Sequence, residues 1–443
     1  MMQGAILLGS KFCAIFLFFS ISAFANYGDS FGIGTRNNFL GGSADVTNGG
    51  SFASEGNPAA LVNSYNAPFD FSFRTNDPSL VNTNLTFSNP PPTGLPSDPY
   101  QAQNAGSMNT ISGGGNLPLG KRLTIGGSII MPTDSLAKIY AYSGNESNYL
   151  HYMDRSARPE IYTGLGVRAT DWLSAGLGFL GSAKADGTLQ TGITQSNAEA
   201  RVLLELKPII IPYGGLLFEK TLGAGKLLFG SAYRMESSSE ANLTVDMRIQ
   251  VGAYGTLPFS ADSQLISYYD PAKLSLGMGF ETDAAGLYLA AENIYWSGYK
   301  SNIVKLTGSD LDVLRNGQGS ISPVKLQNAW SIRTGYEMKK WGKILNANLT
   351  NQFGIEYHQS ALPNDPSSLT ILDTERIVLD AGFSLGVPGV KDFIDKPINF
   401  NFGAKWAHLT PKDFSITDST GNLITATIQG NILSLIAGLS FEI

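Results

Sequence analysis

The sequence predicts an all-β protein, a transmembrane antiparallel β-barrel of fourteen strands, and three observations lead to this fold class. Charged residues make up 15% of the 443 residues, which is well below the roughly 25% of an average soluble domain. No stretch after the N-terminus reaches the roughly 18 consecutive apolar residues that a membrane helix needs. Apolar residues instead alternate with small or polar ones over most of the chain, which is typical of strands that face lipid on one side only.

The N-terminus has the pattern of an export signal over residues 1–25. Lys11 supplies a positive charge, residues 12–21 form a short apolar core, and residues 23–25 (Ala-Phe-Ala) are a small-residue cleavage site. An anchoring helix is the alternative, but the apolar run is too short for one. Cleavage would remove Cys13, the only cysteine. We therefore expect an exported chain without disulfides in the outer membrane of a Gram-negative cell.

Residues 26–66 differ from the rest of the chain. Eight glycines lie between Gly28 and Gly56, and apolar residues show no sustained alternation there. The large apolar residues of this segment are Phe31, Phe39, Phe52 and Leu61. A flexible linker would carry fewer apolar side chains. We expect a compact irregular element, with a short helix around residues 58–62, that another part of the protein covers.

From Phe69 onward the dominant period is two, as expected for strands. Phe69, Phe71 and Phe73 alternate with polar residues, and residues 274–280 and 433–443 repeat the pattern. A soluble sandwich would show the same period. Its repetition from residue 67 to 443, behind a single export signal, favours a barrel.

The connections between the alternating segments give the strand count. Short turns are predicted near residues 119–121, 170–171, 222–225, 283–286, 339–342 and 388–392. Longer polar connections are predicted near residues 88–107, 132–158, 187–199, 246–270, 303–321, 360–373 and 411–423. These alternate, so they separate fourteen strands and place both ends of the barrel on the short-turn side, which is periplasmic in outer-membrane barrels. Trp172 and Trp341 lie at predicted short turns, where an aromatic girdle is expected.

Several functional classes find no support in the sequence. The net charge of −6 offers no basic surface for nucleic acid. The histidines are His151, His358 and His408, and none stands with a serine in an arrangement suited to a hydrolase. The loop carboxylates Asp134, Asp154, Asp365 and Asp373 lack the spacing of a calcium-binding loop. We expect no catalytic residues, no metal and no cofactor.

A short motif, Asn57-Pro58-Ala59, lies in the sequence SEGNPAALVNS and resembles the NPA motif of the FadL family of outer-membrane transporters for long-chain fatty acids and other hydrophobic compounds. Four further segments are similar to that family in the same order. They are IGGSIIMP (125–132), PEIYTGLGVRATDWLSAGLGF (159–179), YWSGYKS (295–301) and residues 356–386. The resemblance covers nearly all of the chain after the export signal.

The resemblance implies a barrel of residues 67–443 that is plugged by a small N-terminal hatch, residues 26–66. It also implies that hydrophobic molecules enter from outside by passive diffusion and leave sideways into the membrane, through a gap where the third strand bends inward. Gly126 and Gly127 lie on the matching strand, and glycine is the least costly residue for such a bend. The alternative is that a strand glycine only makes room for the hatch.

The same resemblance implies that movement of the extreme N-terminus, here Tyr27 and Phe31, loosens the bound ligand. It assigns a gating role in the hatch to Asn57, Pro58 and Ala59. The other reading of this motif is structural, because Asn-Pro is an ordinary helix start.

Three cations are candidates for binding a carboxylate head group. Arg168 and Arg333 face the lumen by alternation, and Arg36 lies in the hatch. Interior ion pairs are the alternative, with Asp380 and Glu337 available as partners. Fatty acid and uncharged hydrocarbon both stay open as ligands, and a general diffusion porin or a surface-binding barrel is the alternative function. The expected partners are the hydrophobic ligand and outer-membrane lipid, with no nucleic acid, and the chain is expected to be a monomer.

Overall fold

The computed structural model describes residues 27–63, 68–80, 86–87, 107–133, 148–152, 158–193, 198–250, 256–299, 303–307, 324–344, 347–369, 371–388, 396–417 and 423–442. The predicted export signal lies outside the described residues, and it remains a prediction.

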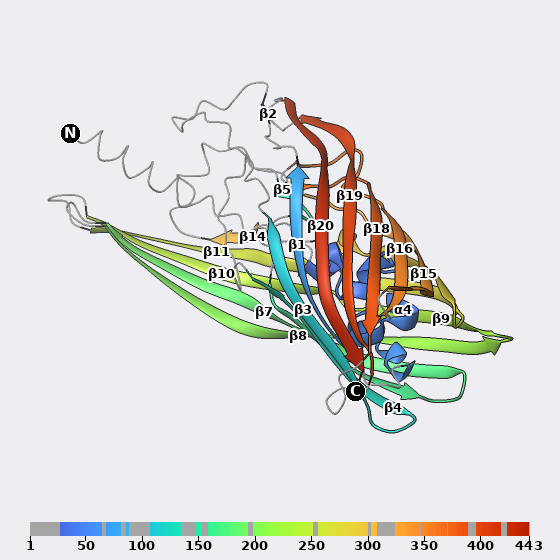
Figure 1. The fold of residues 1–443 in the computed structure, drawn as a ribbon. Coiled ribbons are helices and arrows are strands. Elements are labelled where there is room, and N and C mark those ends of the chain that lie inside the picture. The colour runs from blue at the N-terminus through green and yellow to red at the C-terminus, as the bar shows by residue number, and fades with distance from the viewer. Residues whose placement is uncertain are drawn as a thin grey trace.

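Fourteen antiparallel strands close into a barrel (Figure 1). They are β1 (Pro68–Leu80), β3 (Met108–Pro118), β4 (Leu123–Pro132), β6 (Glu160–Arg168), β7 (Leu173–Ile193), β8 (Ala198–Leu222), β9 (Gly225–Arg234), β12 (Lys273–Glu281), β13 (Ala285–Ile294), β15 (Ala329–Ile344), β16 (Ala347–His358), β18 (Arg376–Val387), β19 (Ile398–Thr417) and β20 (Leu423–Glu442). Each strand pairs with the next in this order, and β20 pairs with β1. The predicted fold class and strand count are confirmed.

Six further strands are short or lie outside the closed barrel. They are β2 (Thr86–Phe87), β5 (Asn148–Tyr149), β10 (Ser237–Gln250), β11 (Thr256–Asp270), β14 (Ile303–Thr307) and β17 (Ile371–Leu372). The hairpin of β10 and β11 lies between β9 and β12 in the chain, and β10 runs parallel to the outer part of β7. Together with the outer parts of β7 and β8 it forms a long sheet that projects away from the barrel (Figure 1).

This projection corrects two of the predicted connections. Residues 187–199 were expected to be a polar loop, but β7 continues to Ile193 and β8 begins at Ala198. Residues 246–270 were also expected to be a loop, but most of them belong to β10 and β11. In β10, Leu243, Val245, Met247 and Ile249 alternate with polar residues, so the period of two that marks a strand continues into the predicted loop.

The prediction of a turn at residues 339–342 is also wrong. β15 continues to Ile344 there, and its register with β16 shifts between Met338 and Gly342. The extra residues of this irregularity are 339–341, between the pairs Met338–Asn351 and Gly342–Leu349. A mostly polar stretch that ends in glycine is typical of a turn in sequence and also of a β-bulge.

The outer face of the barrel is apolar. Phe71 and Phe73 on β1 and Leu276 and Met278 on β12 are all exposed, while the residues between them face the lumen. Such a band of exposed apolar side chains is stable only against lipid. Trp172, at the short turn before β7, is exposed and stacks on Phe218 at a centroid distance of 5.9 Å, as predicted for an aromatic girdle.

No helix in the described part of the chain is long and apolar enough to cross a membrane.

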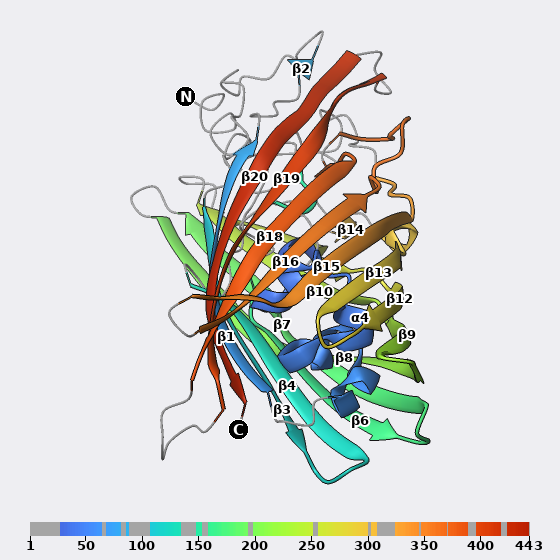
Figure 2. The same cartoon turned by 45° about the vertical axis from the view of Figure 1, so that its right-hand side comes forward.

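The hatch occupies the lumen as a set of short helical turns (Figure 2). They are α2 (Tyr27–Phe31), α3 (Thr35–Phe39), α4 (Asp45–Asn48), η1 (Gly50–Phe52), α5 (Ala53–Gly56) and η2 (Pro58–Asn63). The four predicted apolar anchors are all buried, with Leu61 at 0% and Phe39 at 1% exposed.

Glycines on the inner face of the barrel make room for this hatch. A Cβ atom at Gly382 or Gly403 would overlap the ring of Phe39, and one at Gly354 would overlap the backbone of Gly41. Gly41 itself has a φ of 61°, a conformation that side chains other than glycine rarely adopt. The high glycine content therefore reflects close packing between two layers of backbone.

Candidate functional site

Asn57 ties the hatch to the barrel wall. Its side chain is fully buried. Its Nδ2 atom donates hydrogen bonds to the carbonyl oxygens of Val46, at 2.8 Å, and of Leu216 on β8, at 3.1 Å. Its Oδ1 atom accepts a hydrogen bond of 3.0 Å from the backbone N–H of Ala59. One side chain thus joins two parts of the hatch to one strand.

Pro58 and Ala59 lie directly against the barrel backbone. A Cβ atom at Gly176 on β7 would overlap the peptide between them, and one at Gly215 on β8 would overlap Asn57. Ala59 and Leu61 pack with Leu217 in a buried apolar cluster. The motif therefore lies in direct contact with the backbone of two barrel strands.

The bend predicted at Gly126 and Gly127 is not present. β4 pairs with β3 and with β6 without interruption through both glycines. Gly126 faces the lumen, where a Cβ atom would overlap the side chain of Leu61, whereas Gly127 has only the carbonyl oxygen of Tyr162 near its Cβ position, at 3.7 Å. The alternative interpretation, that the glycine makes room for the hatch, explains Gly126.

The two glycines should therefore respond differently to the same substitution. Gly126→Val should displace Leu61 and loosen the hatch, so that amides of η2 exchange with solvent at least about tenfold faster, since overpacking costs about 1–3 kcal/mol. Gly127→Val should leave the exchange unchanged and serves as the matched control. Hydrogen exchange read by mass spectrometry gives the answer, and equal effects of the two variants would contradict this placement.

Arg36 is paired inside the lumen. Its Nε and Nη2 atoms each donate a 2.9 Å hydrogen bond to the carboxylate of Glu337 on β15. Its Nη1 atom donates to the carbonyl oxygen of Asn48 at 2.7 Å, and Nη2 also donates to the hydroxyl of Tyr288 at 2.8 Å. This is the ion pair that the sequence offered as the alternative to a ligand contact.

Arg333 and Arg168 are paired as well. Arg333 forms an ion pair with Glu292 on β13 and lies 3.8 Å from the Glu356 carboxylate on β16. Arg168 forms a 2.5 Å ion pair with Glu219 on β8 and donates to the carbonyl oxygen of Val62 in the hatch. Each of the three predicted cations therefore has an acidic partner in the barrel wall.

Asp29 in α2 bridges two further cations that sequence reasoning missed. It pairs with Arg234 on β9 and, at 3.0 Å, with Lys273 on β12. Burial by itself would raise the pKa of the Asp29 carboxyl, but Arg234 and Lys273 hold this pKa well below its usual range. Arg234 is the last residue of β9 and Lys273 is the first residue of β12, and both face the lumen. Alternation could therefore have predicted that they face the lumen, but it could not have predicted that they lie opposite Asp29.

Phe31, at the end of α2, belongs to a large buried apolar cluster, the outer apolar cluster. Its members include Phe31, Leu150, Tyr152, Tyr269, Trp296, Tyr299, Leu362 and Leu372. Many of them come from the connections β4–β6, β13–β15 and β16–β18, at the end of the barrel with the longer connections. The ring of Phe31 meets that of Tyr152 edge to face at 5.9 Å, so the hatch forms the floor of this cluster. Tyr27 is the first residue of α2.

Arg376, the first residue of β18, is a further lumen cation that sequence reasoning missed, and it forms no ion pair with a described residue. Its side chain is buried, with its guanidinium carbon 5.7 Å from the centre of the Tyr152 ring. It lines a small cavity together with Phe31, Tyr152 and His358. Ile377 faces outward, so the period of two would have placed Arg376 in the lumen.

The positive charge of Arg376 acts on the outer apolar cluster. Burial lowers the pKa of His151, in the β4–β6 connection, well below its usual value, and the charge of Arg376 lowers it further. His151 is therefore neutral, and its ring packs edge to face against Trp296 at 5.9 Å. Among the residues that the structure describes, no group of side chains has a metal-binding arrangement.

Comparisons with known proteins agree with this fold. A FadL homologue of Pseudomonas aeruginosa has a TM-score of 0.58 at 12% identity, covering 96% of this chain and 99% of its own. The monoaromatic hydrocarbon channel CymD has a TM-score of 0.53 at 14% identity, covering 94% and 98%. The Pseudomonas putida toluene transporter TodX has a TM-score of 0.51 at 14% identity, covering 94% and 99%. The barrel and hatch have the FadL-type fold that the motifs predicted.

In sequence, the chain is similar to Alkane uptake protein A of Marinobacter nauticus, with 25% identity over 207 residues. The match spans 45% of this chain and 42% of that protein, so it covers less than half of the relative's length. No family model matches the chain.

Proposed function

We propose that this protein takes up hydrophobic molecules across the outer membrane of a Gram-negative cell by passive diffusion. The observation that carries the proposal is a closed barrel with an apolar outer face, whose lumen holds a buried apolar cluster above a hatch. Removing apolar ligand surface from water there is favourable by about 25 cal/mol per Å². The similar proteins named above are described as a fatty acid transporter homologue, hydrocarbon channels and an alkane uptake protein, which supports a channel rather than an enzyme.

A general porin fits the lumen less well. Porins need an open, water-filled channel, whereas the hatch here packs against inward-facing glycines of several strands and forms ion pairs with β9, β12 and β15. Movement of this hatch would be needed for any ligand to pass. The sideways exit into the membrane and the monomeric state remain parts of the proposal.

Among the described residues, Arg376 beside the outer apolar cluster is a suitable partner for the acidic head of a fatty acid. A buried cation without an ion pair is costly, and an anionic ligand that pairs with it regains part of that cost. Arg376 is such a cation, and it lies beside Phe31 and Tyr152, whose rings could contact the alkyl chain. A fatty acid therefore fits this site better than an uncharged hydrocarbon.

Substitution of Arg376 tests the function and the ligand class together. Arg376→Met should weaken oleate binding by about tenfold or more, because a hydrogen bond to a charged group contributes about 1.5–3 kcal/mol, and should leave hexadecane binding unchanged. Arg122→Met, at an exposed position beside the β3–β4 turn, is the matched control. Binding to the purified protein in detergent can be followed with radiolabelled ligands. Undiminished oleate binding would exclude Arg376 as the partner of the acid.

Export is the remaining part of the proposal. The intact mass of the protein extracted from outer membranes should correspond to a chain that begins at Asn26, because the small residues at positions 23–25 suit signal peptidase. A mass that includes residues 1–25 would contradict the cleavage and the export route.

A further inference from the structure

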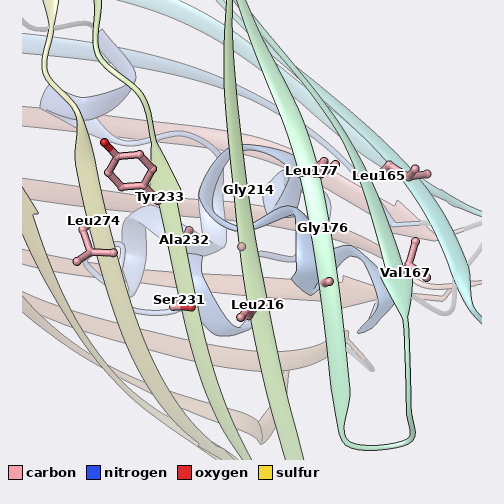
Figure 3. Close-up of a pocket in the computed structure, with 12 residues that line it drawn as sticks. Leu165, Val167, Gly176, Leu177, Gly214, Leu216, Ser231, Ala232, Tyr233 and Leu274 are labelled. Atoms are coloured by element: carbon pink, nitrogen blue, oxygen red, sulfur yellow. The ribbon is translucent and has the colours of Figure 1, made fainter.

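The outer face of the barrel has a depression in its apolar band. Its volume is about 600 Å³, and it lies across β6, β7, β8, β9 and β12 (Figure 3). Three small outward-facing residues, Ala175, Gly214 and Ser231, form its floor. We call it the outer depression.

The register of the strands explains why the depression exists. Leu177 on β7, Gly214 on β8 and Tyr233 on β9 lie side by side in one row. Because Gly214 lacks a side chain, it leaves a gap between two large exposed neighbours. In the next row Ala175 and Ser231 flank Leu216. Gly214 is thus a diagonal neighbour of both small residues, and the spaces above the three residues form one continuous depression.

The depth of the outer depression places it among lipid acyl chains. Trp172 and Phe218 mark the interface near the short turns. Gly214 lies four residues before Phe218 on β8, on the side away from the short turn. This is about 13 Å along the strand and, with the tilt of barrel strands, about 10 Å along the membrane normal. This depth lies within the periplasmic half of a hydrocarbon core about 30 Å thick.

A lysine lies on the same outer face of β8, on the periplasmic side of the aromatic girdle. Lys220 is exposed and follows Gly214, Leu216 and Phe218 at intervals of two along β8. No ion pair joins Lys220 to another described residue. Its position beyond the aromatic girdle is the level of the lipid head groups.

We infer that the outer depression and Lys220 together bind one anionic phospholipid of the periplasmic leaflet. One acyl chain fills the gap over Ala175, Gly214 and Ser231, and the phosphate pairs with Lys220. An acyl chain that fits the gap gains van der Waals contacts with its walls. The cation selects an anionic head group. This lipid is a structural partner of the barrel wall behind the hatch motif, and its binding does not depend on transport.

Native mass spectrometry of the full exported chain, after exchange into detergent with added phosphatidylglycerol, tests this inference. Wild type should retain one phosphatidylglycerol. Ala175→Leu with Ser231→Leu fills the depression and should reduce the retained fraction by about tenfold, since about 1.4 kcal/mol corresponds to that factor. Ala381→Leu, which adds one leucine at another exposed small position, on β18, should have no effect.

Lys220→Gln tests the head-group contact separately. The variant should fold, because an exposed position in the head-group region is not needed for folding. It should reduce the preference for phosphatidylglycerol over phosphatidylcholine by about fivefold. Equal retention by wild type and the filled variant, or a preference unchanged by Lys220→Gln, would overturn the inference. A heat-modifiability gel confirms that each variant is a folded barrel.

Discussion

Deleting residues 27–63 should convert a sealed barrel into an ion-conducting pore. The hatch fills the lumen, and its removal exposes the wall carboxylates Glu292, Glu337 and Glu356 to water. Fourteen strands enclose a lumen wider than the eight-stranded barrels that side chains alone can fill. We expect the conductance in planar bilayers to rise by at least about tenfold, because a barrel of this size without a plug holds a water-filled channel.

The matched control for this deletion removes residues 243–263, the outer part of the β10–β11 hairpin, which lies outside the closed barrel. That deletion should leave the conductance at the level of wild type. An open channel in wild type, or a hatch deletion that conducts no better than wild type, would show that the hatch is not the seal.

Replacing Asp29 with alanine should release α2 from the barrel wall. Asp29 is the carboxylate that bridges Arg234 and Lys273, and its removal leaves Arg234 without this partner in a buried position. Breaking a buried ion pair costs about 3–5 kcal/mol, so the amides of residues 28–33 should lose more than about a hundredfold of their protection against hydrogen exchange. The barrel itself should stay folded.

The contribution of Asp29 should depend on pH in a defined direction. Its pKa is lowered in the folded state by Arg234 and Lys273, although burial opposes this. The stabilisation is therefore fully present above the unfolded pKa of about 4 and is lost only as the pH falls through the lower folded value. Protection of α2 should not change between pH 8 and about pH 5.

The control for Asp29→Ala is Asp171→Ala, at an exposed position in the β6–β7 turn. Protection of α2 that survives in Asp29→Ala, or that is lost equally in Asp171→Ala, would contradict the role of this bridge.

Much of the barrel could be predicted from the sequence, because the membrane imposes a period of two that is visible in single segments such as residues 69–73. Alternation also identified Arg168 and Arg333 as lumen residues. It could not identify their partners, Glu219 and Glu292, because these lie on other strands. Arg36 and Glu337 are 301 residues apart in the chain and meet only when the barrel closes around the hatch. The β10–β11 hairpin was missed although Leu243, Val245, Met247 and Ile249 alternate with polar residues, because its many polar residues are also typical of a loop.

The hatch motif illustrates a second limit. The sequence marked Asn57, Pro58 and Ala59 in the hatch and, separately, Gly126 and Gly127 on the third strand. The direction in which each glycine faces depends on register. Gly126 faces Leu61 and Gly127 does not, although the two are adjacent and identical in type. Arg376 was missed for a different reason, because a cation is recognised as unpaired only when its neighbours are known.

Uptake by cells with an intact lipopolysaccharide layer tests the central claim most directly. Radiolabelled oleate and a small hydrophilic sugar should be offered to a Gram-negative host with and without the protein in its outer membrane. We predict that the protein accelerates oleate uptake by at least about tenfold, because the sugar layer is the main barrier to lipids, and leaves sugar entry unchanged, because the hatch excludes water-filled diffusion. Faster sugar entry without faster oleate uptake would contradict the account and identify the protein as a porin.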